Sequence, residues 1–413
     1  MQEFFMTAGA AQGKRFVDPV FSVLGAAREA IAKYGKDQVV NASIGTIYDD
    51  EEKLAYFPAV SELIKSLPPE QVVDYAPIGG IAGFDQAVLD FAFGKSKPDS
   101  YLAAIATPGG TGAIRNVFYN YADAGTKILL PDWLWGAYNL IAGEYGRLVD
   151  NYQLFTEKHT YNLPSVQAKV KECLREQDNL VVVFNTPAHN PTGFSLSKNE
   201  WEATLSFFKE EAKDSSKRII LLIDVAYMDY AGEPEEIREF FSLLTQLPEN
   251  LLVTIAFSMS KSFLVYGLRC GALIGVSSSQ RVIDEFMAVN AYSTRSNWSN
   301  VTTLPQRIMV QVAGDAALME EINQVRASYR RLMADRASIF VREAQQVNLE
   351  ICPYKAGFFI SIPMDNAKEV ANRLQQERIF AVPLKKGLRL AVCSIPTGKM
   401  AGLAGSIKKA MEK

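Results

Sequence analysis

The sequence contains few of the residues that bind metals or form disulfides. Its 413 residues include two histidines, His159 and His189, and four cysteines. The cysteines are scattered, and no two of them form a Cys-x-x-Cys pair. These counts exclude a histidine-rich zinc centre, a His-Glu-x-x-His protease motif and a disulfide scaffold, so we expect no metal. They also favour a reducing compartment.

Long apolar runs and an excess of one charge are missing as well. The uninterrupted apolar stretches are much shorter than the roughly 20 residues that cross a bilayer. The opening segment MQEFFMTAGAAQGKRF has no basic stretch followed by an apolar one, and so does not match a secretory signal. Lys and Arg number 43 and Asp and Glu 46, a net charge of −3. This charge gives no general attraction to nucleic acid or anionic membrane, and we expect a cytoplasmic protein that binds neither.

Short apolar runs separated by helical patterns predict an α/β domain. Five runs are rich in valine, isoleucine or leucine at consecutive positions, as strands buried on both faces of a parallel sheet are. They cover residues 127–130, 181–184, 219–223, 252–257 and 271–276. Helical patterns, for example at 165–176 and 198–213, lie between them. This alternation predicts a mainly parallel sheet flanked by helices.

The last hundred residues have a different pattern. A long charged amphipathic stretch over 315–346 precedes strand patterns at 358–362 and 388–392, with a helical pattern at 366–377 between them. We therefore expect a large α/β domain over residues 49–310. Residues 311–413, together with the N-terminal residues 1–48, would form a smaller α+β domain.

One lysine follows a predicted strand and is a candidate for imine chemistry. Lys261, in SMSKSFLVYGLRCG, comes just after the run 252–257. Desolvation lowers the pKa of an amine, and a lysine with a lowered pKa can form a Schiff base with a carbonyl. Ser258, Ser260 and Arg269 flank it, and two hydroxyls with a guanidinium can hold a phosphate. Taken singly, a loop lysine is more often a surface residue and a serine more often a turn or capping residue.

An acid ends another predicted strand. Asp224, in IILLIDVAYMDY, follows the run 219–223, and ligands of open α/β sheets bind at the carboxyl ends of the strands. A carboxylate buried there needs a cation, and a protonated pyridine nitrogen is such a partner. Tyr227 lies three residues further on and could donate to a phenolate oxygen of the same ring. The alternative for Asp224 is a cap of the following helix.

Two loops add candidate ligands for an anion and a ring oxygen. TPGGTGAIRNVF places Gly110 and Thr111 before a helical pattern that starts at residue 113, and the N–H groups of a helix start can bind an anion. This run matches neither the ATP-binding nor the dinucleotide-binding glycine motif. NTPAHNPTG places Asn190 after the strand 181–184, where its amide could donate to a ring oxygen. Asn-Pro is also an ordinary turn signal.

Taken together and in this order, the motifs resemble those of the class I aminotransferases, which are fold-type I enzymes dependent on pyridoxal phosphate. Within that family the resemblance is to the aspartate and aromatic amino acid aminotransferases. It extends over nearly the whole chain, from about residue 16 to about residue 396. The resemblance implies a mainly parallel, seven-stranded sheet in the large domain and pyridoxal 5'-phosphate as the cofactor.

The resemblance also implies a role for each motif residue. Lys261 would hold the cofactor as a Schiff base and later move the proton. Asp224 would pair with the pyridinium nitrogen, and Tyr227 and Asn190 would hydrogen-bond the ring phenolate oxygen. The phosphate would be held by Gly110, Thr111, Ser258, Ser260 and Arg269.

Further residues are implied at the ring face and around the substrate. Trp133, in PDWLWG, would stack on the ring, and the histidine that the family often has three residues later would here be Gly136. Arg389, in GLRLAV, would bind the substrate α-carboxylate in a bidentate fork. Gly45, in ASIGTIY, falls where the family has a flexible glycine near the substrate. Trp133 and Asn190 would contact the substrate too.

Two more positions imply a homodimer with shared active sites. Tyr75, in VDYAPIGG, matches a tyrosine that reaches the phosphate of the neighbouring subunit. Arg295, in TRSNWSN, matches an arginine that crosses the dimer to bind a side-chain carboxylate of the substrate. The alternative for Arg295 is a solvated charge at the interface.

The implied activity is transamination between an amino acid, either aspartate or an aromatic one, and a 2-oxo acid such as 2-oxoglutarate. The kinetics would be ping-pong, because the amino group passes first to the enzyme and then to the second substrate. The same residues also serve Cβ–S lyases and decarboxylases of this fold. A non-catalytic protein that binds the cofactor is a more remote alternative.

Overall fold

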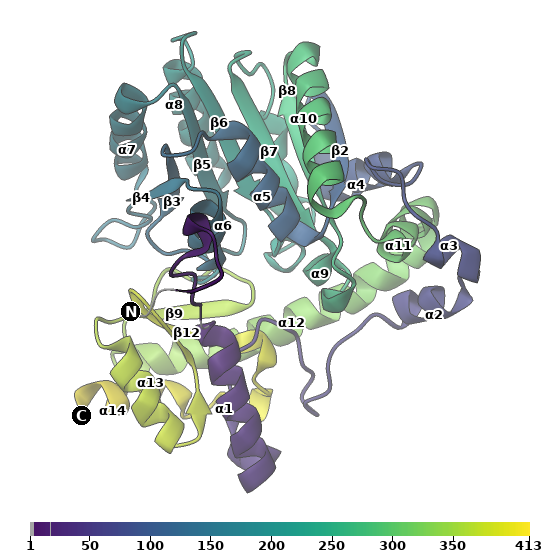
Figure 1. The fold of residues 1–413 in the computed structure, drawn as a ribbon. Helices are drawn as coiled ribbons and strands as arrows, with labels where there is room; N and C mark the ends of the chain where they lie inside the picture. Colours follow the sequence, from purple (N-terminus) through teal and green to yellow (C-terminus); the bar gives the residue numbers. More distant parts are fainter. Residues whose placement is uncertain (1–3, 17) are drawn as a thin grey trace.

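A computed structural model describes residues 4–16 and 18–413 of the chain. Figure 1 shows a large lobe, in which helices flank a central sheet, and a smaller lobe that holds the C-terminus. The helix α12 (Ala316–Gln346) runs between the two lobes. Within the described residues, no helix is long and apolar enough to cross a membrane. The same residues contain no group of three or more His, Cys, Asp or Glu side chains arranged to hold a metal ion.

A seven-stranded sheet forms the centre of the large lobe, in the order β2-β8-β7-β6-β5-β3-β4. The strands are β2 (Tyr101–Thr107), β3 (Lys127–Pro131), β4 (Leu148–Tyr152), β5 (Asn179–Asn185), β6 (Arg218–Asp224), β7 (Leu251–Ser258) and β8 (Gly271–Ser277). The strands from β7 to β4 run parallel, which confirms the mainly parallel sheet. The parallel direction expected for 271–276 was wrong, because β8 pairs antiparallel with β7 and β2. Residues 259–270 connect β7 to β8, and their one α-helix is the single turn Met259–Ser262, so they form no crossover helix of the usual kind.

Helices cover both faces of this sheet, as the composition of the strands predicts. In β5, Leu180, Val182 and Phe184 belong to one hydrophobic core, and Val181 and Val183 to the other. Alternate side chains thus bury both faces. The large-lobe helices are α2 (Pro58–Ser66), α3 (Pro69–Val73), α4 (Phe84–Phe93), α5 (Gly109–Tyr121), α6 (Ala137–Glu144), α7 (Leu163–Glu176), α8 (Lys198–Glu211), α9 (Met259–Ser262), α10 (Gln280–Trp298) and α11 (Thr303–Gly314).

The smaller lobe combines the C-terminal segment with N-terminal elements. Its antiparallel sheet has the order β11 (Val382–Leu384), β12 (Gly387–Ala391), β9 (Phe359–Pro363), with α13 (Ala367–Gln376) and α14 (Leu403–Glu412) packed nearby. The N-terminal strand β1 (Val40–Asn41) pairs with β10 (Ile379–Phe380), and α1 (Pro19–Tyr34) contacts β10 and β11.

The long helix α12 belongs to both lobes. Ile322 and Met333 lie in the core of the large lobe, whereas Phe340 and Ala344 lie in the core of the small one. The expected boundary at residues 310 and 311 falls inside α11, and the division of the chain into domains at 48 and 310 stays a prediction. The arrangement puts the carboxyl ends of β5, β6 and β7 beside the three-stranded sheet of the small lobe (Figure 1).

Candidate active site

The carboxyl ends of the parallel strands bring most of the predicted cofactor residues to one cavity of about 330 Å³. Of the residues predicted to bind the cofactor, the lining includes Gly110, Thr111, Asn190, Asp224, Tyr227, Ser258, Ser260, Lys261 and Arg269. Trp133 and Tyr75 do not line it. A neighbouring cavity of about 560 Å³ shares Asn190, Tyr227 and Lys261 with the first and also contains Arg389 and Gly45. Residues far apart in the sequence therefore meet where the two lobes face each other.

Lys261 lies in the short helix α9, directly after β7, and lines both cavities. Burial disfavours its ammonium form and lowers the pKa of the amine to about 8. The Asp224 carboxylate partly opposes this effect, and the Arg269 guanidinium adds to it. The Nζ atom lies 5.3 Å from the centre of the Tyr227 ring. An amine with this pKa is partly neutral, and hence nucleophilic, near neutral pH.

Asp224 is buried at the end of β6 and faces the smaller cavity. Its Oδ2 accepts hydrogen bonds from Tyr138 Oη at 2.6 Å and Asn185 Nδ2 at 3.0 Å, and its Oδ1 accepts from Ala226 N–H at 3.1 Å. Burial raises the pKa of this carboxyl, and the three donors and Lys261 oppose that rise. The bond from Ala226 is the kind a helix cap makes, whereas the other two come from side chains of α6 and β5 and hold the carboxylate in place.

Tyr227 and Asn190 form the next part of the wall. Asn190 Nδ2 donates to Tyr227 Oη at 3.3 Å, and the ring of Tyr227 packs edge-on against Phe358 and Phe359. Asn190 Oδ1 accepts from Arg389 Nη1 at 3.4 Å. Two hydrogen-bonding groups, a phenol and an amide, are thus fixed side by side on the cavity wall, where they can bind one ring oxygen.

The glycine run forms the first turn of α5. The helix begins at Gly109, so the expected start at residue 113 was wrong, and Gly110 and Thr111 lie within the helix. The N–H groups of a first helical turn have no partners inside the helix and can bind an anion. Gly109 has a φ of +69°, and a Cβ there would lie 2.8 Å from Arg269 Nη2. Glycine is needed at this position because the guanidinium passes so close to the backbone.

Two hydroxyls and a guanidinium face this helix start. Ser260 Oγ accepts from Arg269 Nη1 at 3.2 Å, and Ser258 Oγ accepts from Ser260 N–H at 3.3 Å. All three residues line the smaller cavity together with Gly110 and Thr111. Backbone N–H groups, hydroxyls and one guanidinium form a donor set that fits a phosphate.

Arg389 gives the larger cavity a buried cation. It lies on β12, its Nη2 donates to the Ser43 carbonyl at 2.8 Å, and its Cζ stacks 4.3 Å from the centre of the Phe359 ring. Among the described residues no ion pair within 4.0 Å joins it to a carboxylate, and its buried Nε has no hydrogen-bond partner. Burial lowers its pKa, but a guanidinium remains charged in a protein. A buried cation without an anion is a receptor for a carboxylate.

Trp133, the tryptophan predicted to stack on the ring, lines neither cavity, whereas Trp135 lines both. Trp133 is turned toward the small lobe, where a Cβ at Gly387 would come within 2.9 Å of its ring. The residue three positions after Trp135 is Tyr138, so Gly136 is not the position that backs Asp224. Sequence reasoning missed Trp135, Tyr138 and Asn185. The spacing of Trp135 and Tyr138 in WGAY, and the position of Asn185 opposite Asp224 on the neighbouring strand, were the available signals.

Comparison with known proteins decides the family. Residues 37–407, most of the chain, match the family model described as aminotransferase class I and II. The chain belongs to this family. The aminotransferase is 38% identical to a structure described as an aminotransferase from Anaerococcus prevotii, with a TM-score of 0.97 over 99% of this chain and 100% of that one. This likeness and the mainly parallel sheet confirm the expected fold class.

Two relatives carry more specific names. The aminotransferase is 22% identical to the aromatic-amino-acid aminotransferase of Escherichia coli, over 95% of this chain and 98% of that protein. It is 26% identical to the aspartate aminotransferase of Salmonella typhi, over 74% of this chain and 76% of that protein. An aromatic-amino-acid aminotransferase from Burkholderia pseudomallei, covalently bound to pyridoxal phosphate, has the same fold, with 22% identity and a TM-score of 0.79 over 98% of this chain and 100% of that one. The enzyme is a pyridoxal-phosphate-dependent aminotransferase, and its phosphate-binding donor set and buried Asp224 fit that cofactor.

Three predicted residues lie around or outside these cavities. Gly45 lines the larger cavity, and a Cβ there would lie 2.7 Å from the ring of Phe359. Tyr75 is 84% exposed, and Arg295 is exposed on α10, where its Nη1 donates to Ser299 Oγ at 2.5 Å. Neither lines a cavity of its own chain beside Lys261. Their contribution across a homodimer stays a prediction.

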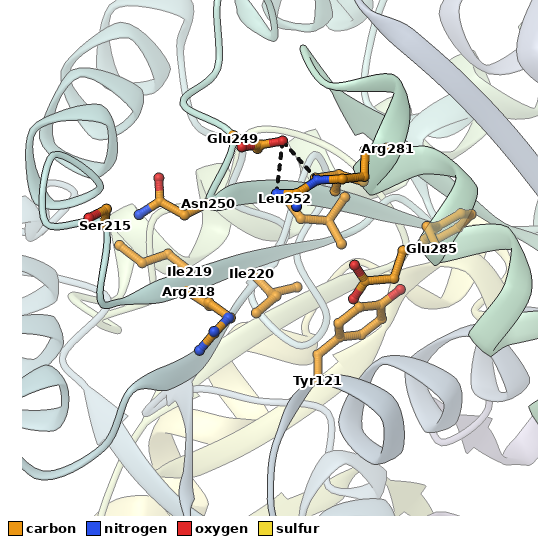
Figure 2. A pocket seen from close by; sticks show the side chains of 12 residues that line it. Tyr121, Ser215, Arg218, Ile219, Ile220, Glu249, Asn250, Leu252, Arg281 and Glu285 are labelled. Atoms are coloured by element: carbon orange, nitrogen blue, oxygen red, sulfur yellow. Dashed lines mark hydrogen bonds and ion pairs between the residues drawn. The ribbon is translucent and has the colours of Figure 1, made fainter.

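A separate cavity of about 320 Å³ lies away from this chemistry (Figure 2). It is formed at the amino ends of β6 and β7, by Arg218, Ile219 and Leu252 among others. Arg281 and Glu249 form an ion pair of 3.1 Å at its edge. None of the residues predicted from the sequence to bind cofactor or substrate lines it, so it belongs to no part of the active site.

Proposed function

We propose that the aminotransferase transfers the amino group of aspartate or an aromatic amino acid to a 2-oxo acid such as 2-oxoglutarate, by a ping-pong mechanism. The observation that carries this proposal is the position of Lys261, an amine with a pKa of about 8, in one cavity with the buried Asp224. An amine with this pKa can both bond to a carbonyl carbon and move a proton. Aspartate and aromatic substrates are named because the relatives carry those names.

The residues of the smaller cavity are proposed to hold the cofactor. Pyridoxal 5'-phosphate supplies an aldehyde and a ring that draws electrons from a neighbouring carbon. Lys261 would bond to the aldehyde carbon and, when released, carry a proton on its Nζ. Asp224 would bind the ring nitrogen, and Tyr227 and Asn190 the ring oxygen. The phosphate would be held by Gly110, Thr111, Ser258, Ser260 and Arg269.

The larger cavity is proposed to hold the amino acid. Arg389 would bind its α-carboxylate in a bidentate fork, because the guanidinium is buried and has no carboxylate partner among the described residues. Gly45, Asn190 and Trp135 would line the space around the reacting carbon. The apolar walls of the two lobes would exclude water when they approach each other.

A homodimer in the cytoplasm completes the proposal. Arg295, reaching across the dimer, would bind the side-chain carboxylate of aspartate, and Tyr75 would reach the cofactor phosphate of the other subunit. The exposure of both side chains in the single chain supports this proposal, because a contact between subunits must start from the surface.

An absorbance spectrum tests the activity and the choice of substrate together. Purified enzyme with pyridoxal phosphate should show the visible band of the cofactor bound to Lys261, and aspartate should bleach it. Bleaching only by tyrosine or phenylalanine would place the enzyme in the aromatic group and leave Arg295 without a substrate role. The variant Lys261→Ala should fold normally and show no turnover. Release of ammonia and pyruvate without any need for an oxo acid would refute transamination and favour a lyase.

A further inference from the structure

A fully buried tyrosine contacts the carboxylate that faces the cofactor cavity. Tyr138, on α6, is 0% exposed, and its ring packs against Phe118 and Trp135. Its Oη lies 2.6 Å from Asp224 Oδ2 and 2.9 Å from Asn185 Nδ2. A phenol has one hydrogen to donate and lone pairs with which to accept. The direction of each hydrogen bond therefore affects which charge state of Asp224 is favoured.

The amide of Asn185 fixes those directions. Its Oδ1 accepts from the Asn190 N–H at 2.8 Å, so its Nδ2 must point to the other side. The Nδ2 group then donates toward Tyr138 Oη and Asp224 Oδ2, two oxygens that lie 2.6 Å apart on the same side of it. Because the Tyr138 oxygen accepts from Asn185, its own hydrogen is directed at Asp224. A series of hydrogen bonds therefore runs from the Asn190 N–H through Asn185 and Tyr138 to the Asp224 carboxylate.

These hydrogen bonds leave Asp224 with a single direction in which to bind the cofactor. An ionised carboxylate has about four lone-pair positions. Tyr138 and Asn185 occupy two on Oδ2, and the Ala226 N–H occupies one on Oδ1. All three neighbours donate, and hydrogen bonds donated to a carboxylate favour its ionised form. The one free lone pair is on Oδ1, and the residue lines the cofactor cavity.

We propose that Tyr138 is a positioning residue for the cofactor: it keeps Asp224 ionised, with Oδ1 free to accept from the protonated ring nitrogen. The inference rests on the proposed function, because it assigns the ring nitrogen to Asp224. Tyr138 itself lines neither cavity. It acts through Asp224, and Asn185 supports it by fixing the direction in which its hydroxyl donates.

The experiment compares Tyr138→Phe with Tyr152→Phe in the full-length enzyme. Tyr152 is a matched control, because it is buried in the same lobe and its hydroxyl donates to the Val183 carbonyl at 2.9 Å, away from Asp224. The first readout is the ¹⁵N chemical shift of the ring nitrogen in labelled pyridoxal phosphate, followed against pH. The second is the dissociation constant of pyridoxal phosphate and of its deaza analogue, in which a C–H group replaces the ring nitrogen.

In Tyr138→Phe the ring nitrogen should lose its proton at a pH about one unit lower than in the wild type. Affinity for pyridoxal phosphate should fall about tenfold, the factor that about 1.4 kcal/mol represents, and affinity for the deaza analogue should not change. Tyr152→Phe should show neither effect. An unchanged ¹⁵N titration, or an equal loss of affinity for both compounds, would overturn the inference.

Two further measurements separate this inference from other causes of failure. If Tyr138→Phe does not fold, Asn185→Ala provides the same test, because it removes one donor to Asp224 and frees the Tyr138 hydroxyl to turn. Its ¹⁵N titration should shift in the same direction by less, and no shift would overturn the inference. A wild-type enzyme that fails to bind pyridoxal phosphate at all would refute the proposed function, whereas normal binding with no effect of Tyr138→Phe refutes only this inference.

Discussion

Replacing Lys261 by methionine should stabilise the cofactor-free protein at neutral pH. Methionine is a flexible apolar side chain of similar length and lacks the amine. In the wild type the ammonium is partly removed from water, and this burial lowers the pKa of Lys261 from 10.5 to about 8. A group held in a disfavoured charge state lowers the free energy of unfolding. The active site is therefore expected to reduce stability at Lys261, the residue proposed to perform the chemistry.

The size of the effect follows from the two pKa values. The difference between 10.5 and about 8, at about 1.36 kcal/mol per pH unit, gives at most about 3 kcal/mol. A lysine whose pKa is lowered in the folded state destabilises that state fully below a pH of about 8. The effect disappears as the pH rises through 10.5, because the lysine of the unfolded chain then loses its proton too. We expect Lys261→Met to be more stable by up to about 3 kcal/mol at pH 7 and by less than about 1 kcal/mol at pH 10.

Urea denaturation of the cofactor-free proteins at pH 7 and pH 10, followed by circular dichroism, measures the difference. The exposed lysine Lys158 provides a control, and Lys158→Met should change the free energy of unfolding by less than about 0.5 kcal/mol at either pH. Equal stability of Lys261→Met and wild type at pH 7 would refute the reasoning. A gain that is the same at both pH values would show that shape or hydrophobicity, and not the buried charge, is its cause.

Two more predictions concern the ring face and the phosphate. Trp135→Ala should weaken pyridoxal phosphate binding about tenfold by fluorescence titration, because an aromatic contact is lost, whereas Trp133→Ala should mainly lower the free energy of unfolding, by about 3 kcal/mol in urea. A loss of cofactor affinity in Trp133→Ala and not in Trp135→Ala would show that Trp133 contacts the ring. Gly109→Ala should weaken cofactor binding in isothermal titration, since its Cβ would lie 2.8 Å from Arg269 Nη2, and Gly143→Ala, where a Cβ meets nothing within 4 Å, should leave it unchanged. Equal affinities for these two variants would contradict the close approach.

The sequence predicts those parts of the site that depend on one local pattern. Lys261 and Asp224 each end an apolar run, and the sheet brings such ends together because parallel strands share one carboxyl edge. Trp135 could not be chosen over Trp133, because PDWLWG has two tryptophans and the turn after β3 decides which faces the cavity. Asn185 was overlooked for a related reason, since its role depends on its position opposite Asp224 on the neighbouring strand.

The fold shows the same division between local and long-range information. The runs of β5, β6 and β7 were predicted because strands buried on both faces need consecutive apolar residues. The outer strands β2 and β4 were missed, because exposed or partly buried positions interrupt their apolar pattern. The direction of β8 depends on how residues 259–270 return to the sheet, and an apolar run is the same in either direction. Composition therefore indicates burial, and the connections decide topology.

The two cations of the active site illustrate how one kind of burial produces two functions. Lys261 and Arg389 both line the larger cavity, and burial lowers the pKa of each. The lysine amine reaches a pKa of about 8 and can exist without its proton, whereas a guanidinium keeps its charge at any pH at which the protein is folded. In the proposed function, Lys261 would therefore exchange protons and form bonds while Arg389 would hold a carboxylate throughout. An amino acid needs both at once, because its carboxylate must stay bound while its nitrogen is transferred.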